Sequence, residues 1–224
     1  MAIALDAATT SAIAYSSSPR TFAHTVGSGS NRLLIVGVAT LWVDGVTCNS
    51  VTYNDVAMVK ARADHNATSA KDVESSIWIL HNPPTGAHSV VITPTGSTYI
   101  GSVAVSYTGC VQTCVADAVN GNTGTAAGDQ VISVNTIADN CWIFACGGLA
   151  SGTTITADQT SRGNSNDSPR AMNCEDTNAA QTPAEGHNIG FTIAGATLTW
   201  AISGASFAPV AEAAGGHMCQ VIIV

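Results

Sequence analysis

Charged residues are what this sequence most lacks. Only 10% of its 224 residues are charged, against about 25% in typical soluble proteins. Seven Lys and Arg stand against fifteen Asp and Glu, which gives a formal net charge of −8. A chain with this balance has no basic field to attract a phosphate backbone, so we expect no nucleic-acid partner. Its surface must be covered mainly by Ser, Thr, Asn, Gly and Ala, as is common in extracellular and virion β proteins.

Long apolar runs are also missing. No stretch approaches the roughly 18 consecutive apolar residues of a membrane span. The N-terminal residues Met1 to Asp6 lack the cationic segment and long apolar run of a secretory signal. We therefore expect no membrane partner and no signal peptide.

The cysteines do not form a recognisable framework. There are seven, an odd number, and no two are spaced as Cys-x-x-Cys, which argues against both a complete disulfide set and a zinc knuckle. We expect most of them to be free buried thiols. Cys110 and Cys114 could close a small loop, whereas Cys141 and Cys146 differ in parity along one strand and should point to opposite faces.

Motifs for catalysis and metal binding are absent as well. No Gly-x-Ser-x-Gly turn occurs, and the six histidines lack the close pairing that usually builds a metal site. Neither the Asp-x-Asp-x-Asp-Gly pattern of calcium loops nor an obvious acidic Glu in an apolar pocket is seen. His88 and His187 each follow a turn with Pro and Gly and are predicted to bond loop carbonyls. We expect no catalytic residue, cofactor or metal, and hence a chain that is not an enzyme.

What the chain does contain is a series of short runs rich in Val, Ile, Thr and aromatics between Gly, Pro, Asn and Asp clusters, which is typical of strands and turns. No long helix is predicted. The clearest predicted strands cover residues 32–41, 46–53, 75–80, 88–93, 99–107, 130–134, 141–146, 153–157, 188–193, 198–207 and 218–224. Weaker ones lie near 2–5, 12–15 and 22–26, and the polar segments 64–72 and 161–169 are predicted to be surface loops.

The second half of the chain echoes the first. Asn31-Arg-Leu-Leu-Ile-Val-Gly-Val opens a strand in the first half, and Asn140-Cys-Trp-Ile-Phe-Ala-Cys-Gly opens one in the second. Each half then has a turn, a His and a strand, and its return strand ends on an aromatic, Tyr107 or Phe207. Self-similarity of this kind predicts two similar structural units.

These patterns predict an all-β fold, a two-sheet antiparallel sandwich of jelly-roll or Greek-key type with an internal pseudo-repeat. The two halves, about 20–110 and 129–208, would pair as two sheets whose apolar faces meet about 10 Å apart. We expect one domain over 1–224, with arms at 1–19 and 209–224.

Four segments carry a resemblance to a known kind of module. They are Asn31-Arg-Leu-Leu-Ile-Val-Gly-Val, Val51-Thr-Tyr-Asn-Asp-Val-Ala-Met, Trp78-Ile-Leu-His-Asn-Pro-Pro-Thr-Gly-Ala-His88 and Val103-Ala-Val-Ser-Tyr-Thr-Gly109. Together they resemble a β-sandwich module that recurs in virion proteins of tailed phages and in bacterial surface proteins. The resemblance covers roughly residues 20–207 and rests on turns and strand ends, so it implies fold and setting and no catalytic residue. The chain departs from it in its cysteine-rich second half, and we expect it to stand alone, whereas this module is often one part of a longer chain.

The resemblance implies a virion structural protein, most simply a capsid decoration (cement) protein on the capsid surface. Its partners would be the major capsid protein or another virion protein and further copies of itself, expected as a homotrimer. The assembly contacts would include the apolar end Val221, Ile222, Ile223 and Val224. The alternatives are a carbohydrate-binding tail, fibre or adhesin module and a self-assembling extracellular filament subunit, which would place the chain outside the cell or at its surface. Candidate glycan or partner contacts are Trp42, Tyr53, Asn66 and Asn166.

Overall fold

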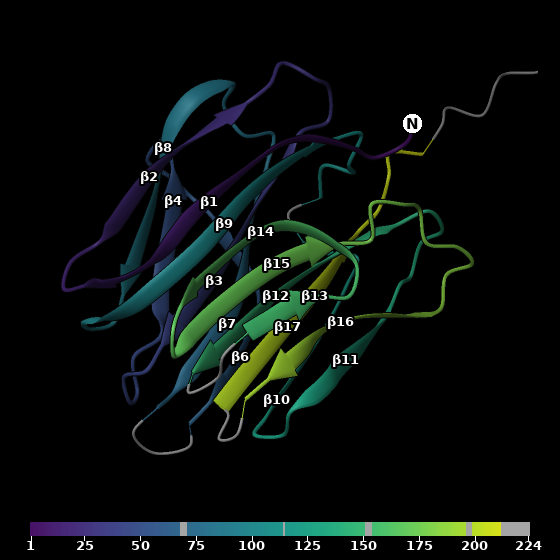
Figure 1. Cartoon of the computed structure of the whole chain (residues 1–224). Helices are drawn as coiled ribbons and strands as arrows, with labels where there is room; N and C mark the ends of the chain where they lie inside the picture. Colours follow the sequence, from purple (N-terminus) through teal and green to yellow (C-terminus); the bar gives the residue numbers. More distant parts are fainter. Residues whose placement is uncertain (68–70, 114, 151–153, 196–198, 212–224) are drawn as a thin grey trace, which may run out of the picture.

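The computed structural model describes residues 1–67, 71–113, 115–150, 154–195 and 199–211, and every regular element in these ranges is a β-strand (Figure 1). The prediction of an all-β fold built from antiparallel sheets is confirmed. No helix that could span a membrane occurs in these ranges.

The first half forms two sheets. Its strands are β1 (Ala4–Ser16), β2 (Arg20–Val26), β3 (Leu33–Leu41), β4 (Cys48–Tyr53), β5 (Val56–Ala57), β6 (Val59–Asn66), β7 (Val73–His81), β8 (Gly86–Pro94) and β9 (Thr98–Thr108). The first inner sheet has the order β1-β9-β3-β7-β6, and the first outer sheet has the order β2-β8-β4-β5. The first and last strands of the half are neighbours, as in a jelly roll.

The second half repeats this arrangement. Its strands are β10 (Ala118–Gly124), β11 (Gly128–Asn135), β12 (Trp142–Ala150), β13 (Thr154–Ala157), β14 (Thr160–Asp167), β15 (Arg170–Asp176), β16 (Gly186–Ala194) and β17 (Thr199–Phe207). The second inner sheet has the order β10-β17-β12-β15-β14, and the second outer sheet has the order β11-β16-β13. Taken in chain order, every strand of the first half except β5 has a counterpart at the same place in the second half.

A shared irregularity supports the internal repeat. β6 carries a bulge between Lys60 and Arg62 where it pairs with β7, and β14 carries one between Ser161 and Gly163 where it pairs with β15. The contacts between halves are reciprocal too, because β1 packs on β14 while its counterpart β10 packs on β6. The two halves therefore meet as the subunits of a symmetric dimer do, within one chain.

The four sheets form four layers that enclose three apolar cores. One core lies between the two inner sheets and includes Leu33, Ile35, Phe144 and Phe207. The other two lie between each inner sheet and its own outer sheet. The expected meeting of the halves through apolar faces is found, but the structure has two more layers than the expected pair of sheets, since each half is already a sandwich.

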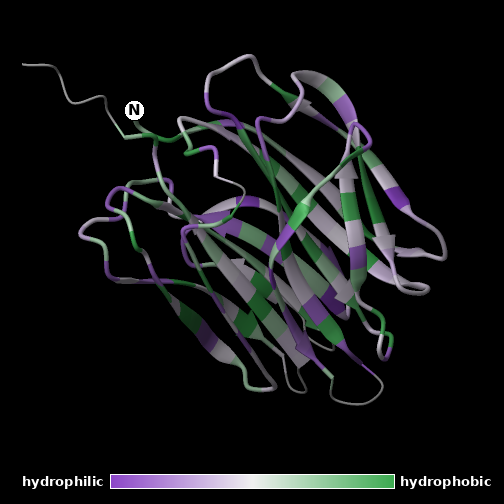
Figure 2. Cartoon of the chain, turned by 180° about the vertical axis from the view of Figure 1, so that it is seen from behind, coloured by the Kyte–Doolittle hydropathy of each residue, from purple (hydrophilic) through white to green (hydrophobic). Residues whose placement is uncertain are grey.

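Burial on both faces explains the continuous apolar runs of the sequence. On β3, Leu34 and Val36 face the first outer sheet, whereas Leu33 and Ile35 face the second inner sheet. Strands of the outer sheets have one solvated face, so buried and exposed residues alternate along them, as in the second part of β11. Figure 2 shows hydrophobic bands recurring along the strands of both halves.

Three boundary predictions are wrong. Residues 4–16, expected within an arm with only weak strands near 2–5 and 12–15, form one continuous edge strand, β1, which pairs with β9 along most of its length. Residues 161–167, expected as a loop, belong to β14, and 64–66 belong to β6. β14 and the end of β6 are rich in polar and charged residues and β1 is rich in Ala, Ser and Thr, so none of the three has the apolar, β-branched composition of a buried strand. The predicted strand at 218–224 lies outside the described residues.

We expect Trp78→Ala to lower the free energy of unfolding by about 3 to 5 kcal/mol. Trp78 is only 4% exposed, belongs to the core between the first two sheets, and donates from Nε1 to Ser76 Oγ at 3.1 Å. Urea denaturation of both proteins measures the difference. Val119→Ala is the control, since Val119 is 41% exposed on β10 and should lose less than about 0.5 kcal/mol. A loss below about 1 kcal/mol for Trp78→Ala would contradict its place in the core.

Candidate functional site

Two of the predicted contact residues are buried and serve the fold. Tyr53 is fully buried, and its hydroxyl donates to the carbonyls of His24 (3.2 Å) and Gly86 (2.9 Å). Asn66 is 6% exposed, and its Nδ2 donates to the carbonyls of Gly124 and Trp200 in the other half. Neither side chain can meet a glycan at the surface. The prediction that they do is wrong, because Tyr53 points into the core between the first inner and outer sheets and Asn66 lies at the contact between the halves.

Trp42 lies in a cluster of aromatic and cationic side chains. The Arg170 guanidinium carbon lies 3.5 Å from the centroid of the Tyr99 ring and 5.5 Å from that of Trp42, and Lys71 Nζ lies 4.9 Å from Trp42. Tyr99 also meets the exposed ring of Tyr15 at 5.2 Å. Cations therefore already pack on Trp42, a partly buried side chain that also contacts the central core. This use reduces the ring surface left for stacking on a sugar.

Asn166 is exposed on β14 and lines a groove of about 240 Å³ between β14 and β13. Of the four predicted contact residues, it alone lies in a groove with an open side lined by polar groups. Its neighbours there include Thr156, Asn164 and Asn173. The sequence signal was the continuous polar run of residues 160–167, which forms the edge strand β14.

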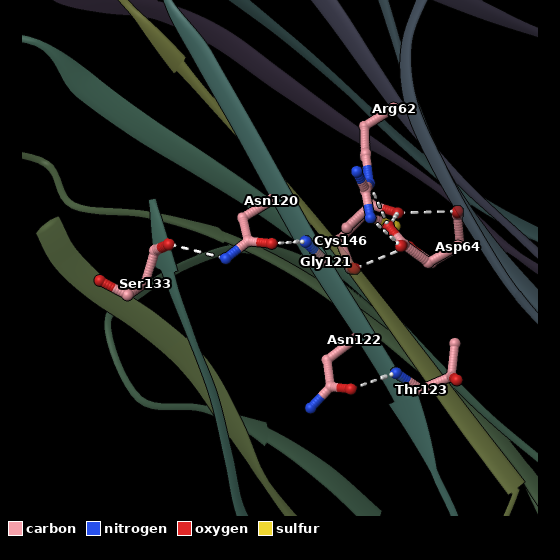
Figure 3. A network of polar contacts seen from close by, with 10 residues as sticks. Arg62, Asp64, Asn120, Gly121, Asn122, Thr123, Ser133 and Cys146 are labelled. Atoms are coloured by element: carbon pink, nitrogen blue, oxygen red, sulfur yellow. Dashed lines mark hydrogen bonds and ion pairs between the residues drawn. The ribbon is translucent and has the colours of Figure 1, made fainter. Parts of the chain in front are cut away.

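A polar network joins the halves at the edge formed by β6 and β10 (Figure 3). Asp64 accepts from Arg62 Nε at 2.9 Å and from Ser203 Oγ at 2.7 Å, so it links β6 to β17. Ser203 Oγ also lies 2.9 Å from the Ser75 carbonyl, and Ser75 Oγ donates to the Cys146 carbonyl at 2.7 Å. Every oxygen in this chain of contacts has a partner within the protein, as burial requires. The network holds the halves together and offers no open site.

Glu175 is the most unusual carboxyl group of the described chain. It is fully buried on β15, on the side that faces the second outer sheet. Burial raises its pKa to about 7, although the N–H groups of Gln159 (2.7 Å) and Gly190 (3.0 Å) donate to it and favour the carboxylate. The contacts fix the turn between β13 and β14 against β16. We therefore assign Glu175 a positioning role.

The predicted structural histidines behave as expected. His88 Nε2 lies 3.0 Å from the Thr85 carbonyl, and His187 Nε2 lies 2.8 Å from the Pro183 carbonyl. Both rings thus bond the turn that precedes their strand. His24 is different: burial lowers its pKa to about 4, against the opposing effect of Asp6, and its ring nitrogens contact Thr9 and Ser106 hydroxyls.

The cysteines in the described ranges are free buried thiols, as predicted: Cys48, Cys110, Cys141, Cys146 and Cys174. Burial raises the pKa of Cys48, Cys110 and Cys141 to about 12, which keeps these thiols protonated and unreactive at neutral pH. Cys114, the suggested partner of Cys110, lies outside the described residues.

The carboxylates in and near the polar segments of the second half are dispersed. Asp176 is buried and accepts from Tyr107 and Arg162, Asp167 pairs with Arg170, and Asp158 accepts from Thr192. Within the described ranges, no group of three or more His, Cys, Asp or Glu side chains is arranged to hold a metal ion.

The two described ends of the chain lie together at one end of the sandwich, seen beside the N label in Figure 1. The Met1 amino group donates to the Val210 carbonyl at 2.9 Å, and the backbones of Cys110 and Pro209 pair as an isolated antiparallel β-bridge. Together the two ends line an open groove of about 690 Å³. Its other walls come from Ala138, Asp139, Asn140, Trp142 and Ala180. Within this lining Met1 is 53% exposed, and Ala180 is exposed as well. We call this surface the terminal groove.

Comparisons of the chain with protein-family models, with curated proteins and with solved structures give no match. The predicted assembly residues Val221, Ile222, Ile223 and Val224 lie outside the described residues.

We expect Glu175→Gln to remove a pH-dependent part of the stability. The folded-state pKa of about 7 lies above the ordinary value of 4.5, so the protonated carboxyl stabilises the fold fully below pH 4.5, and this stability is lost as the pH rises through 7. The free energy of unfolding of the parent should therefore fall by about 1 to 3 kcal/mol across this interval relative to the variant. Urea denaturation at a series of pH values measures it.

The buried His24 changes the stability in the opposite direction over a neighbouring pH range. His24, whose pKa is lowered to about 4 from 6.5, confers stability that is present above pH 6.5 and lost as the pH falls through 4. Both proteins carry His24, so their difference isolates Glu175. Parallel curves for the parent and Glu175→Gln would contradict the assignment.

Proposed function

We propose that this chain is a non-enzymatic structural protein that acts through assembly, specifically a capsid decoration protein of a phage virion. One observation carries the proposal: the terminal groove, where both described chain ends, a half-buried tryptophan and exposed apolar side chains gather on one surface. Exposed apolar surface at a concave site is what a protein contact buries. A four-layer sandwich supplies the rigid body that such a clamp needs.

The sequence after Ala211 supports an assembly role for this end of the molecule. Ala211 itself lines the terminal groove, and the chain continues into a segment that holds the apolar run Val221–Val224. We propose that this run contacts a neighbouring copy at its terminal groove. Repetition of that contact around an axis would give a closed ring, expected as a homotrimer, whose partner on the shell is the major capsid protein or another virion protein.

The weakly charged composition fits the same role. With 10% charged residues, the protein depends little on ion pairs, which salt screens, and would hold its contacts through apolar and main-chain groups. A filament subunit would use similar groups, but its contact would not close into a ring. Light scattering distinguishes the two, since a ring has one mass and a filament has a mass that grows with concentration.

We expect deletion of residues 215–224 to leave the sandwich folded and to reduce the oligomer to monomers, because the deleted run supplies the contact. Light scattering gives the mass, and co-sedimentation with purified tailed-phage capsid shells gives shell binding. An unchanged mass and unchanged shell binding in the deletion would contradict the proposal.

A point variant tests the groove itself. Ala180→Asp places a charge on an exposed residue of the terminal groove lining and should weaken self-association about tenfold or more, which corresponds to about 1.4 kcal/mol. Val131→Asp is the matched control, since Val131 is 45% exposed on β11, outside the groove lining. Equal loss of association in both variants would show that added charge alone, and not the groove, is responsible.

A further inference from the structure

The groove between β13 and β14 is a feature that the assembly role does not use. β13 is an edge strand of the second outer sheet, and β14 is an edge strand of the second inner sheet. The groove between them has a volume of about 240 Å³. It therefore opens at the side of the second sandwich, between its two layers.

The first half shows why this groove is open. There, residues 54–58 connect β4 to β6, and they include β5, which pairs with β4 along the same edge. Met58 N also donates to the Val51 carbonyl at 2.9 Å, which extends this cover. In the second half, only Asp158 and Gln159 connect β13 to β14. Among the described residues no strand takes the place of β5, and none pairs with the free edge of β13.

The groove is lined almost entirely by uncharged hydrogen-bonding side chains: Thr154, Thr156, Gln159, Ser161, Asn164, Asn166 and Asn173, with Ile155 and Ala157 between them. The bulge in β14 after Ser161 brings this arrangement about. Beyond it, Asn164 lies directly opposite Asn173 of β15, and Asn166 lies on the same face as Asn164. Amides and hydroxyls that both donate and accept suit a ligand with many hydroxyl groups and no charge.

Hydrogen-bonding capacity in the groove is left over by the fold. Among the described residues, the side chains of Thr154, Thr156, Asn164 and Asn166 have no hydrogen-bond partner. Asn173 on the groove wall is only 2% exposed, accepts from Ser161 Oγ at 2.9 Å, and donates one N–H to the Ile155 carbonyl at 3.4 Å. Its second amide N–H has no partner in the described chain, which is costly for a buried group unless a water or a ligand accepts from it.

The groove is also held rigidly. Glu175 lies on the same strand as Asn173. Its carboxyl oxygens accept from the backbone N–H groups of Gln159 at 2.7 Å and of Gly190 at 3.0 Å. The turn that closes one end of the groove is thus fixed to two neighbouring strands. A site fixed before binding loses less entropy when a ligand enters.

We propose that this groove binds a neutral oligosaccharide. The hydroxyl groups of the sugar would pair with Asn164, Asn166 and the free N–H of Asn173, and an apolar face of the sugar would lie on the half-buried Ala157. The site belongs to the second half alone, because β5 covers the corresponding edge of the first. A molecule that decorates a surface would in this way also attach to glycans.

The test is a titration of the full chain with short neutral oligosaccharides of the cello-, malto-, xylo- and galacto- series. Binding is measured by calorimetry and by the NMR chemical shifts of the backbone amides. We expect at least one series to bind with a Kd in the millimolar range or tighter and to move the signals of Thr156 and Asn164. Asn164→Ala and Asn166→Ala should each weaken this binding about tenfold, the effect of one or two lost hydrogen bonds.

Asn188→Ala is the matched control, because Asn188 is an exposed Asn on β16 that lies outside the groove and should leave the affinity unchanged. The proposal is overturned if no series binds at millimolar concentration, or if the two groove variants bind as well as the parent. Sugar binding is measured here without reference to oligomeric mass, so its failure leaves the assembly proposal standing.

Discussion

The two inner sheets approach each other closely because small residues stand where they cross. A side chain at Gly37 would place its Cβ 2.5 Å from Cys174 Sγ and 3.1 Å from Cys146 Cβ, and one at Gly148 would lie 3.1 Å from Ala39 Cβ. Such distances leave no space for even one methyl group. This contact buries the second face of each inner sheet, and the central core of the molecule exists only because of it.

Polar groups inside this contact fix how the halves are placed. Tyr107 of the first half donates to Asp176 of the second at 2.6 Å, and Arg162 Nε donates to the same carboxylate at 2.7 Å. Burial together with the Asp176 carboxylate raises the pKa of Tyr107 well above its usual value, so its hydroxyl remains a donor. A shift of the sheets would leave these groups buried without partners, which is far more costly than the loss of apolar contact alone.

The repeated halves have diverged at equivalent positions, and the divergence separates their roles. Trp78 of β7 pairs with Val36, and at the corresponding place of β15 Glu175 pairs with Ala145. The first half thus fills its sandwich with an aromatic ring and covers its edge with β5. The second half instead holds a buried carboxyl group that fixes a turn beside an uncovered edge. The two repeated halves form the body of the protein, and the shorter connection between β13 and β14 leaves a groove in the second half.

Local sequence by itself determined the all-β class, most strand positions and the internal repeat, because apolar runs, turn residues and strand-end aromatics act over a few neighbours. It did not show β15, whose Asn173, Glu175 and Asp176 are buried with partners from other strands. Nor did it show that Tyr53 and Asn66 are covered, or that Asn166 joins Asn164 and Asn173 in one groove. These outcomes depend on which layers stack and which edges stay uncovered, and only contacts between residues distant in the chain decide that.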